Sequence, residues 1–301
     1  MIRVGIPRGL LYYQYGQQWE YFLRELGAEV VVSEPTSKIT LDCGSCLDEV
    51  CLPAKVFFGH VCQLCHQVDY LFVPRVVSTA KGQYTCPKII GMPDMLRSNL
   101  GQLPPLIDVP INMREQRHQL LRAVIEIGRM LNKGAMASLR AWQQAWRVKS
   151  LKPEPPAVYS IQPRVGLIAH PYVIYDEQVS MGVLGKLSRL GVSVITPDMV
   201  DEYEINRALK TLNKKIFWSN SQYMAGAALA LLQDVHPVDG LIFMTTFACG
   251  PDALIGELIG QYAQIYQVPC MLLSLDEHTA EAGLITRLVA FIDMLERRLR
   301  V

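Results

Sequence analysis

The sequence predicts an α/β protein with two lobes, each built on a short parallel sheet, and a helical arm that joins them. In both halves of the chain, short apolar runs alternate with apolar residues at helical spacing. The stretch between the halves is charged, helical in its pattern and without a strand signal. The chain has 301 residues, of which 50% are hydrophobic, and this is enough for two domains with cores of their own.

The first lobe, expected over residues 1–111, opens with a strand, a helix and a second strand. The helix is expected to end at Gly27, and two strands joined in this way lie parallel and side by side. The elements expected in this lobe are strands at 2–7, 29–33, 70–74 and 106–109 and helices at 10–26, at 53–67 and from Pro87 or Met92 onward.

The helical arm is expected over residues 112–158 and the second lobe over 159–301. Gly134 breaks the helical pattern of the arm, and the proline-rich stretch 152–156 is expected to be a stiff linker. The second lobe repeats the plan of the first without a visible sequence repeat. Its expected elements are an opening strand and turn at 164–171, strands at 192–196, 238–245 and 270–275, and helices at 180–190, 223–233, 253–266 and 281–299.

The charge pattern excludes two classes of partner. The formal net charge is +1 and the basic residues are scattered, so we expect neither a nucleic acid nor a membrane surface as a partner. Met1 leads directly into an apolar strand, which is not the pattern of a signal peptide. The most apolar helical run, 225–232, is far shorter than the roughly 20 residues that span a bilayer. We therefore expect a cytoplasmic protein.

Cysteines are concentrated in one part of the first lobe. Thiols in the cytosol are kept reduced, so clustered cysteines there indicate metal binding or redox work more often than disulfides. Six of the eight cysteines fall between Asp42 and Cys86. These six are Cys43, Cys46, Cys51, Cys62, Cys65 and Cys86.

Four of these thiols form two Cys-x-x-Cys pairs, Cys43 with Cys46 and Cys62 with Cys65, separated by 15 residues. This spacing is typical of a tetrahedral four-thiolate site, which holds zinc or a second iron–sulfur cluster. Cys51 lies between the pairs, so two alternatives stay open: a larger cluster that uses some of the four, and thiols without a metal. Cys270, inside a predicted strand, is expected to be a core residue.

Three further cysteines, Cys51, Cys86 and Cys249, are expected near the carboxyl ends of strands, where parallel sheets bind ligands. A proline follows each within two residues, which is typical of a helix start, and a helix start lowers the pKa of a thiol. Three thiolates on separate loops suit a cubane cluster with one open iron. The alternative is that the three are small buried apolar residues.

Six short motifs, taken together, identify a family. The chain resembles the activase-related branch of the 2-hydroxyacyl-CoA dehydratase and benzoyl-CoA reductase superfamily over nearly its whole length. The two Cys-x-x-Cys pairs are not part of that family's pattern. The motifs are Gly5-Ile6-Pro7-Arg8, Asp48-Glu49-Val50-Cys51-Leu52-Pro53-Ala54-Lys55, Gly59-His60, Tyr84-Thr85-Cys86-Pro87-Lys88, Cys249-Gly250-Pro251-Asp252 and Asp276-Glu277-His278-Thr279.

The resemblance implies two flavodoxin-like or Rossmann-like lobes and a [4Fe-4S] cluster between them, held by Cys51, Cys86 and Cys249. It also implies that relatives carry a double-cubane [8Fe-9S] cluster at a dimer interface. An ATP-dependent activator with its own cluster is the implied electron donor, and a homodimer or hetero-oligomer is the implied assembly. This chain has no Gly-x-x-x-x-Gly-Lys phosphate loop, so we expect a partner to bind the ATP.

The function expected from this is an iron–sulfur protein that accepts low-potential electrons from the activator and reduces a small molecule or an acyl-CoA. The alternative is a non-catalytic iron–sulfur or zinc-binding accessory or scaffold subunit, so the sequence does not decide whether the chain is an enzyme. Among other polar residues, His170 and the Asp276-to-Thr279 segment are expected at strand ends near the site. Lys55 and Lys88 are expected to offset thiolate charge.

Overall fold

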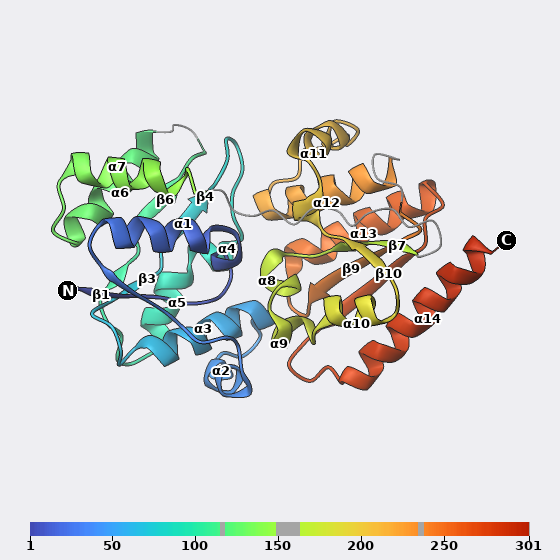
Figure 1. Ribbon diagram of the computed structural model, residues 1–301, viewed down its shortest axis with the longest axis horizontal. Coiled ribbons are helices and arrows are strands. Elements are labelled where there is room, and N and C mark those ends of the chain that lie inside the picture. The colour runs from blue at the N-terminus through green and yellow to red at the C-terminus, as the bar shows by residue number, and fades with distance from the viewer. Residues whose placement is uncertain (115–117, 149–162, 234–237, 301) are drawn as a thin grey trace. The chain divides into compact units, whose positions relative to one another are not determined.

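The computed structural model describes residues 1–114, 118–148, 163–233 and 238–300. It divides the chain into two compact units, Met1–Leu151 and Lys152–Val301 (Figure 1). Each unit contains a four-stranded parallel sheet, and the two sheets have the same order of strands. The predicted fold class, two α/β lobes with short parallel sheets, is confirmed. Within the described parts of the chain, no helix is long and apolar enough to cross a membrane.

The first sheet has the order β2-β1-β3-β5. Its strands are β1 (Arg3–Ile6), β2 (Glu29–Val32), β3 (Tyr70–Phe72) and β5 (Leu106–Ile107). Helix α1 (Tyr12–Glu25) connects β1 to β2 and buries Trp19, Phe22 and Leu23. The helix ends before Gly27, whose φ of +78° lies in the left-handed region that glycine adopts without strain.

The remaining elements of the first unit surround this sheet. Helix α7 packs on α1, where the rings of Trp142 and Phe22 meet edge to face with centroids 5.4 Å apart. Helices α6 and α7 both lie in the first unit, and the three-part division of the chain stays a prediction. The predicted linker 152–156 lies outside the described residues. The elements are α2 (Lys38–Gly44), α3 (Leu52–Leu64), β4 (Arg75–Ser78), α4 (Pro87–Ile90), α5 (Met92–Asn99), β6 (Pro110–Asn112), α6 (His118–Met130) and α7 (Ala135–Ala145).

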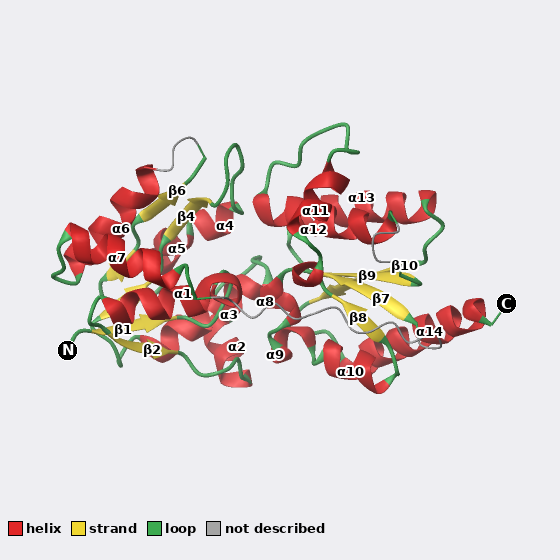
Figure 2. Ribbon diagram, turned by 45° about the horizontal axis from the view of Figure 1, so that its top comes forward, coloured by secondary structure: helices red, strands yellow, loops and turns green. Residues whose placement is uncertain are grey.

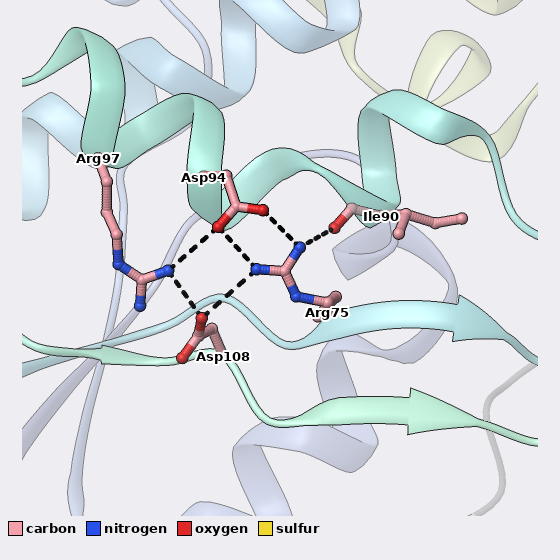
Figure 3. A network of polar contacts seen from close by, with 5 residues as sticks. All are labelled: Arg75, Ile90, Asp94, Arg97 and Asp108. Atoms are coloured by element: carbon pink, nitrogen blue, oxygen red, sulfur yellow. Dashed lines mark hydrogen bonds and ion pairs between the residues drawn. The ribbon is translucent and has the colours of Figure 1, made fainter.

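An ion-pair network ties strand β4 to helix α5 (Figure 3). The Arg75 guanidinium donates two hydrogen bonds to the Asp94 carboxylate at 2.7 and 2.8 Å and a third to the carbonyl of Ile90 at 3.0 Å. Arg97 donates to Asp108 at 2.8 Å. The parallel pair β4–β6 is therefore held against the helices that follow Cys86 in the chain.

The second sheet has the order β10-β9-β7-β8. Figure 2 shows α12 and α13 on one face of this sheet and α10 and α14 on the other. Helix α12 is buried along most of its length, and Gly166 of β7 leaves no room for a side chain, since a Cβ there would lie 2.5 Å from Leu241 Cδ2. The strands are β7 (Arg164–Ile168), β8 (Ser193–Ile195), β9 (Gly240–Thr246) and β10 (Cys270–Leu275).

Three of the four helices expected in the second unit are present, and the helices at Pro171–Ile174, Pro197–Met199 and Glu202–Leu209 were not expected. In place of the helix expected over 180–190 there are two short helices, Glu177–Ser180 and Val183–Arg189, because Met181 and Gly182, with φ values of 52° and 63°, separate them. The helices are α8 (Pro171–Ile174), α9 (Glu177–Ser180), α10 (Val183–Arg189), the 3-10 helix η1 (Pro197–Met199), α11 (Glu202–Leu209), α12 (Ser219–Leu232), α13 (Gly250–Ile265) and α14 (Glu281–Leu299).

Candidate metal-binding sites

Helices α2 and α3 bring the two Cys-x-x-Cys pairs together. Cys43 lies in the last turn of α2 and Cys46 just beyond it, whereas Cys62 lies in the last turn of α3 and Cys65 is its C-cap. Cys43, Cys46 and Cys65 all lie close enough to Cys62 to repel its thiolate electrostatically. We call Cys43, Cys46, Cys62 and Cys65 the four-thiol site.

Two glycines allow the helices that carry this site to touch backbone to backbone. A Cβ on Gly44 would lie 2.0 Å from the carbonyl oxygen of Lys55, and a Cβ on Gly59 would lie 1.9 Å from that of Thr40. No side chain fits at either position, since carbon and oxygen atoms do not approach this closely. The close packing of α2 on α3 that places the thiols together therefore depends on Gly44 and Gly59.

Hydrogen bonds between polar side chains fix the same pair of helices. Thr36 Oγ1 lies 3.0 Å from Nε2 of the fully buried His60, and Gln63 donates to Thr40 Oγ1 at 2.7 Å. Ser37 and Thr40 form a reciprocal capping box that starts α2. Two of these polar links hold the start of α2 on α3, and the capping box fixes where α2 begins; a metal site needs such fixed ligands.

The electrostatics of the four-thiol site favour a bound cation. Burial raises the pKa of Cys62 to about 11, and repulsion from Cys43, Cys65 and Cys46 adds to the effect. Burial also raises the pKa of Cys65. Cys43 and Cys46 are exposed, so an ion can reach the site from solvent. Thiolates that repel one another are stabilised by a cation between them, and this donor set fits zinc or an iron–sulfur cluster.

Cys51 and Cys86 also lie near each other, since the charge of Cys51 acts on Cys86. They are the N-caps of α3 and α4, as the prolines at 53 and 87 predicted. Burial raises the pKa of Cys86 above its ordinary value, so the lowered pKa expected of this thiol is not found. The helix start acts in the predicted direction, since hydrogen bonds from the backbone of Lys88 and Ile89 lower the pKa, but burial outweighs them.

Cys249 is the N-cap of α13 and follows strand β9 of the second unit. Its pairing with Cys51 and Cys86 around one cluster stays a prediction. Within the second unit, Cys249 lies beside two other metal-binding side chains, His170 and Asp252, and their donor atoms all lie within 4.8 Å of one another. We call these three residues the His–Cys–Asp site.

Hydrogen bonds hold the side chains of the His–Cys–Asp site in place. His170 Nε2 lies 2.9 Å from Asp252 Oδ1, and Thr245 donates to Asp252 Oδ2 at 3.2 Å. Burial alone would raise the pKa of Asp252, but the charge and hydrogen bond of His170 lower it below its ordinary value, with help from Cys249 and Thr245. Asp252 is thus an ionised carboxylate in a buried position.

Sequence reasoning named His170 and Cys249 separately and did not assign a role to Asp252. In the sequence, His170 and Cys249 are linked by their positions relative to the strands. His170 follows β7 and Cys249 follows β9, and these strands are neighbours in the sheet. Side chains at the carboxyl ends of adjacent parallel strands meet at one edge.

Other predicted residues have simpler surroundings. Lys88 lowers the pKa of Cys86 by its charge, as expected of a lysine that offsets a thiolate. Asp276 caps its own turn by accepting hydrogen bonds from the backbone of His278 and the hydroxyl of Thr279. Cys270 is exposed on the edge strand β10, so its expected place in the core is wrong.

The fold and these sites define an α/β protein with cysteine-rich segments at the ends of its helices, whose side chains are of the types that bind metals. Residues 3–200, about two thirds of the chain, match the family described as CoA enzyme activase uncharacterised domain (DUF2229). The chain belongs to this family. A search of curated proteins found no match.

This family membership corrects two predictions. We expected a protein that accepts electrons from an ATP-dependent activator, and we expected that activator as its partner. The family is a domain of the CoA enzyme activase, which is the activator itself, so both expectations are wrong. The activase-related part of the predicted resemblance is confirmed.

Proposed function

We propose that this chain is the metal-binding accessory domain of a CoA enzyme activase and that its four-thiol site holds an iron–sulfur cluster. Cys43, Cys46, Cys62 and Cys65 are the proposed ligands. The cluster supplies one-electron redox chemistry, which serves an activase that delivers electrons to a CoA enzyme of the 2-hydroxyacyl-CoA dehydratase or benzoyl-CoA reductase type.

The observation that carries this proposal is the convergence of four thiols from two helices. The two cysteine pairs are separated by 15 residues in the chain. Even so, Cys43, Cys46 and Cys65 all lie close enough to Cys62 to repel its thiolate. The chain holds them through two glycine contacts and two polar links between α2 and α3, none of which a solvent-exposed loop needs. Such pre-positioning is what a cluster or zinc site requires.

The protein's own residues have three tasks at this site. The four thiols bind the metal and lose their protons as they do so, because thiolates are the ligands. The buried His60 and Thr40 orient α2 and α3. The exposed side of Cys43 and Cys46 leaves a path for electrons to and from a partner surface. Free thiols of this kind need a reducing compartment, so the proposal places the protein in the cytoplasm.

The test is iron and acid-labile sulfide analysis of anaerobically purified protein, with EPR after reduction. We expect about four irons and four sulfides per chain and a reduced-cluster signal, and twice as much iron would indicate a double-cubane cluster instead. Cys46→Ser should abolish or alter the signal, whereas Cys270→Ser, a change of an exposed thiol outside the site, should not. Stoichiometric zinc without sulfide, or no metal, would overturn the electron-carrying role.

A further inference from the structure

The second unit contains a buried group of metal-binding side chains that the proposed cluster does not use. His170 is 5% exposed and Asp252 is 1% exposed. Cys249 is partly exposed, and the residues before it, Phe247 and Ala248, lie at the surface. The site therefore has a buried side at His170 and Asp252 and a partly exposed side at the thiol.

We propose that the His–Cys–Asp site binds a single first-row transition metal ion, such as zinc or iron(II), through His170, Cys249 and Asp252. Tetrahedral coordination with bonds of about 2.0–2.3 Å requires ligand atoms about 3.3–3.8 Å apart. The three donor atoms already lie within 4.8 Å of one another. The 4.8 Å limit exceeds the upper end of this spacing by about 1 Å.

The donor set selects the class of metal. One imidazole nitrogen, one thiolate and one carboxylate suit zinc, cobalt(II) or iron(II) and do not suit magnesium or calcium, which take oxygen ligands. A neutral imidazole, a thiolate and a carboxylate carry two negative charges, which a divalent cation neutralises. Three protein ligands leave a fourth position open, and the exposed side of Cys249 places it toward solvent.

Two features of the surroundings point to a ligand. Nε2 of His170 faces Asp252, and the other ring nitrogen, Nδ1, is buried with no hydrogen-bond partner among the described residues, although buried polar groups are normally satisfied. Ala248 has a φ of +62°, a strained value for a residue with a side chain, directly before Cys249. Thr245 fixes the Asp252 carboxylate from behind, as outer residues do at metal sites.

All three donors of this site belong to the second unit. They come from β7–α8 and β9–α13 and include neither Cys51 nor Cys86. It gives Cys249 a role different from that in the predicted three-cysteine cluster. The two roles make opposite predictions for Cys51 and Cys86, and this allows an experiment to separate them.

The test is titration with cobalt(II), a spectroscopic probe for zinc and iron sites, on the full chain with Cys46→Ser and Cys62→Ser in place. These two changes disable the four-thiol site, so that failure of this proposal is distinguishable from failure of the proposed cluster. We expect one cobalt per chain with a thiolate-to-cobalt charge-transfer band. His170→Gln, Cys249→Ser and Asp252→Asn should each weaken binding at least about tenfold.

Matched controls make the outcome decisive. Asp198→Asn changes another carboxylate of the same unit, and Cys270→Ser changes another thiol; both should leave cobalt binding unchanged. Cys51→Ser and Cys86→Ser, added to the same background, should also leave it unchanged. No cobalt binding in a folded chain would overturn the proposal. Cobalt binding that is unaffected by His170→Gln, Cys249→Ser and Asp252→Asn would also overturn it. So would cobalt binding that is lost in Cys51→Ser or Cys86→Ser.

Discussion

At the scale of single residues, the protonation of thiols is central to the account. The folded chain raises the pKa of Cys62 to about 11, first by burial and then by repulsion from its three neighbours. The protonated thiol is therefore the form that the metal-free fold prefers. A metal reverses this preference because it binds the thiolate and expels the proton.

The first prediction follows from the pKa of Cys62 in the metal-free chain. Because the folded pKa is higher than the unfolded pKa, the stability that it provides is present below pH 9.0 and is lost as the pH rises to about 11. Cys62→Ser removes this titration. Urea unfolding in the presence of a chelator measures the free energy of unfolding of the unmodified chain and of Cys62→Ser. The difference between the two should shrink or change sign over this pH window. A constant difference from pH 8 to 11 would contradict it.

A second residue-scale prediction concerns Tyr175. Its hydroxyl donates to the Asp198 carboxylate at 2.6 Å, and burial followed by this hydrogen bond raises its pKa. Tyr175→Phe leaves the carboxylate without this donor and should lower the free energy of unfolding by about 1–2 kcal/mol. The control is Tyr203→Phe, at a tyrosine that is 73% exposed, which should change little. Equal effects at the two sites, read from urea melts, would contradict the prediction.

At the scale of elements, the contact between α2 and α3 decides whether the four-thiol site exists. A methyl group on Gly59 has no space beside the carbonyl of Thr40. Gly59→Ala should therefore push the helices apart, lower stability by about 1–3 kcal/mol and weaken metal binding. Gly260→Ala is the matched control, since that helical glycine faces open space and alanine there should be neutral or stabilising. Metal titration and urea melts measure both effects, and a tight metal site in Gly59→Ala would refute the packing argument.

The Arg75 network is the second element-scale contact (Figure 3). The hydrogen bond from Arg75 lowers the pKa of Asp94 below 3.8, so the pair stabilises the fold above this pH and its effect disappears as the pH falls through the folded pKa. Arg75→Met should therefore lower the melting temperature at neutral pH, and the gap from the unmodified chain should narrow in acid. Arg122→Met, an exposed change on α6, should leave the melting temperature unchanged at both pH values. If the difference in melting temperature between Arg75→Met and the unmodified chain stays constant in acid, the ion pair with Asp94 is not its source.

The sequence predicted some elements well and others not at all, for physical reasons. Buried strands such as β7 and β9 are continuous apolar runs, and α14 has a clear helical period that matches 281–299. Helix α2 was missed because its polar, cysteine-bearing turns have no such period. It is held by the capping box and by its packing on α3, which no local pattern reveals.

At the scale of the whole molecule, the two units use the same plan. Each has a parallel sheet in which the first strand lies between the second and third. Helix starts carry two cysteines in the first unit, Cys51 and Cys86, and one in the second, Cys249. Parallel sheets bind ligands at their carboxyl edges, and this explains why sequence spacing located Cys51, Cys86 and Cys249 at helix starts. The pattern did not reveal Asp252, because only the fold brings it to His170.

The direction of electron flow is a property that thiol spacing does not encode. Thiolates and helix starts indicate a metal, and the same ligands occur in proteins that give electrons and in those that take them. The expected role of electron acceptor therefore rested on resemblance, and the family assignment to a CoA enzyme activase corrects it. The four-thiol geometry does not depend on that choice.

X-ray absorption spectroscopy of the metal bound to anaerobic protein tests the central claim most directly, because it counts the sulfur atoms around the metal. At the iron edge we expect a shell of sulfur neighbours at about 2.3 Å and a short iron–iron distance, with a nitrogen or oxygen neighbour appearing in Cys62→Ser. A shell dominated by nitrogen and oxygen in the unmodified chain, or one that Cys62→Ser leaves unchanged, would contradict a cluster held by Cys43, Cys46, Cys62 and Cys65.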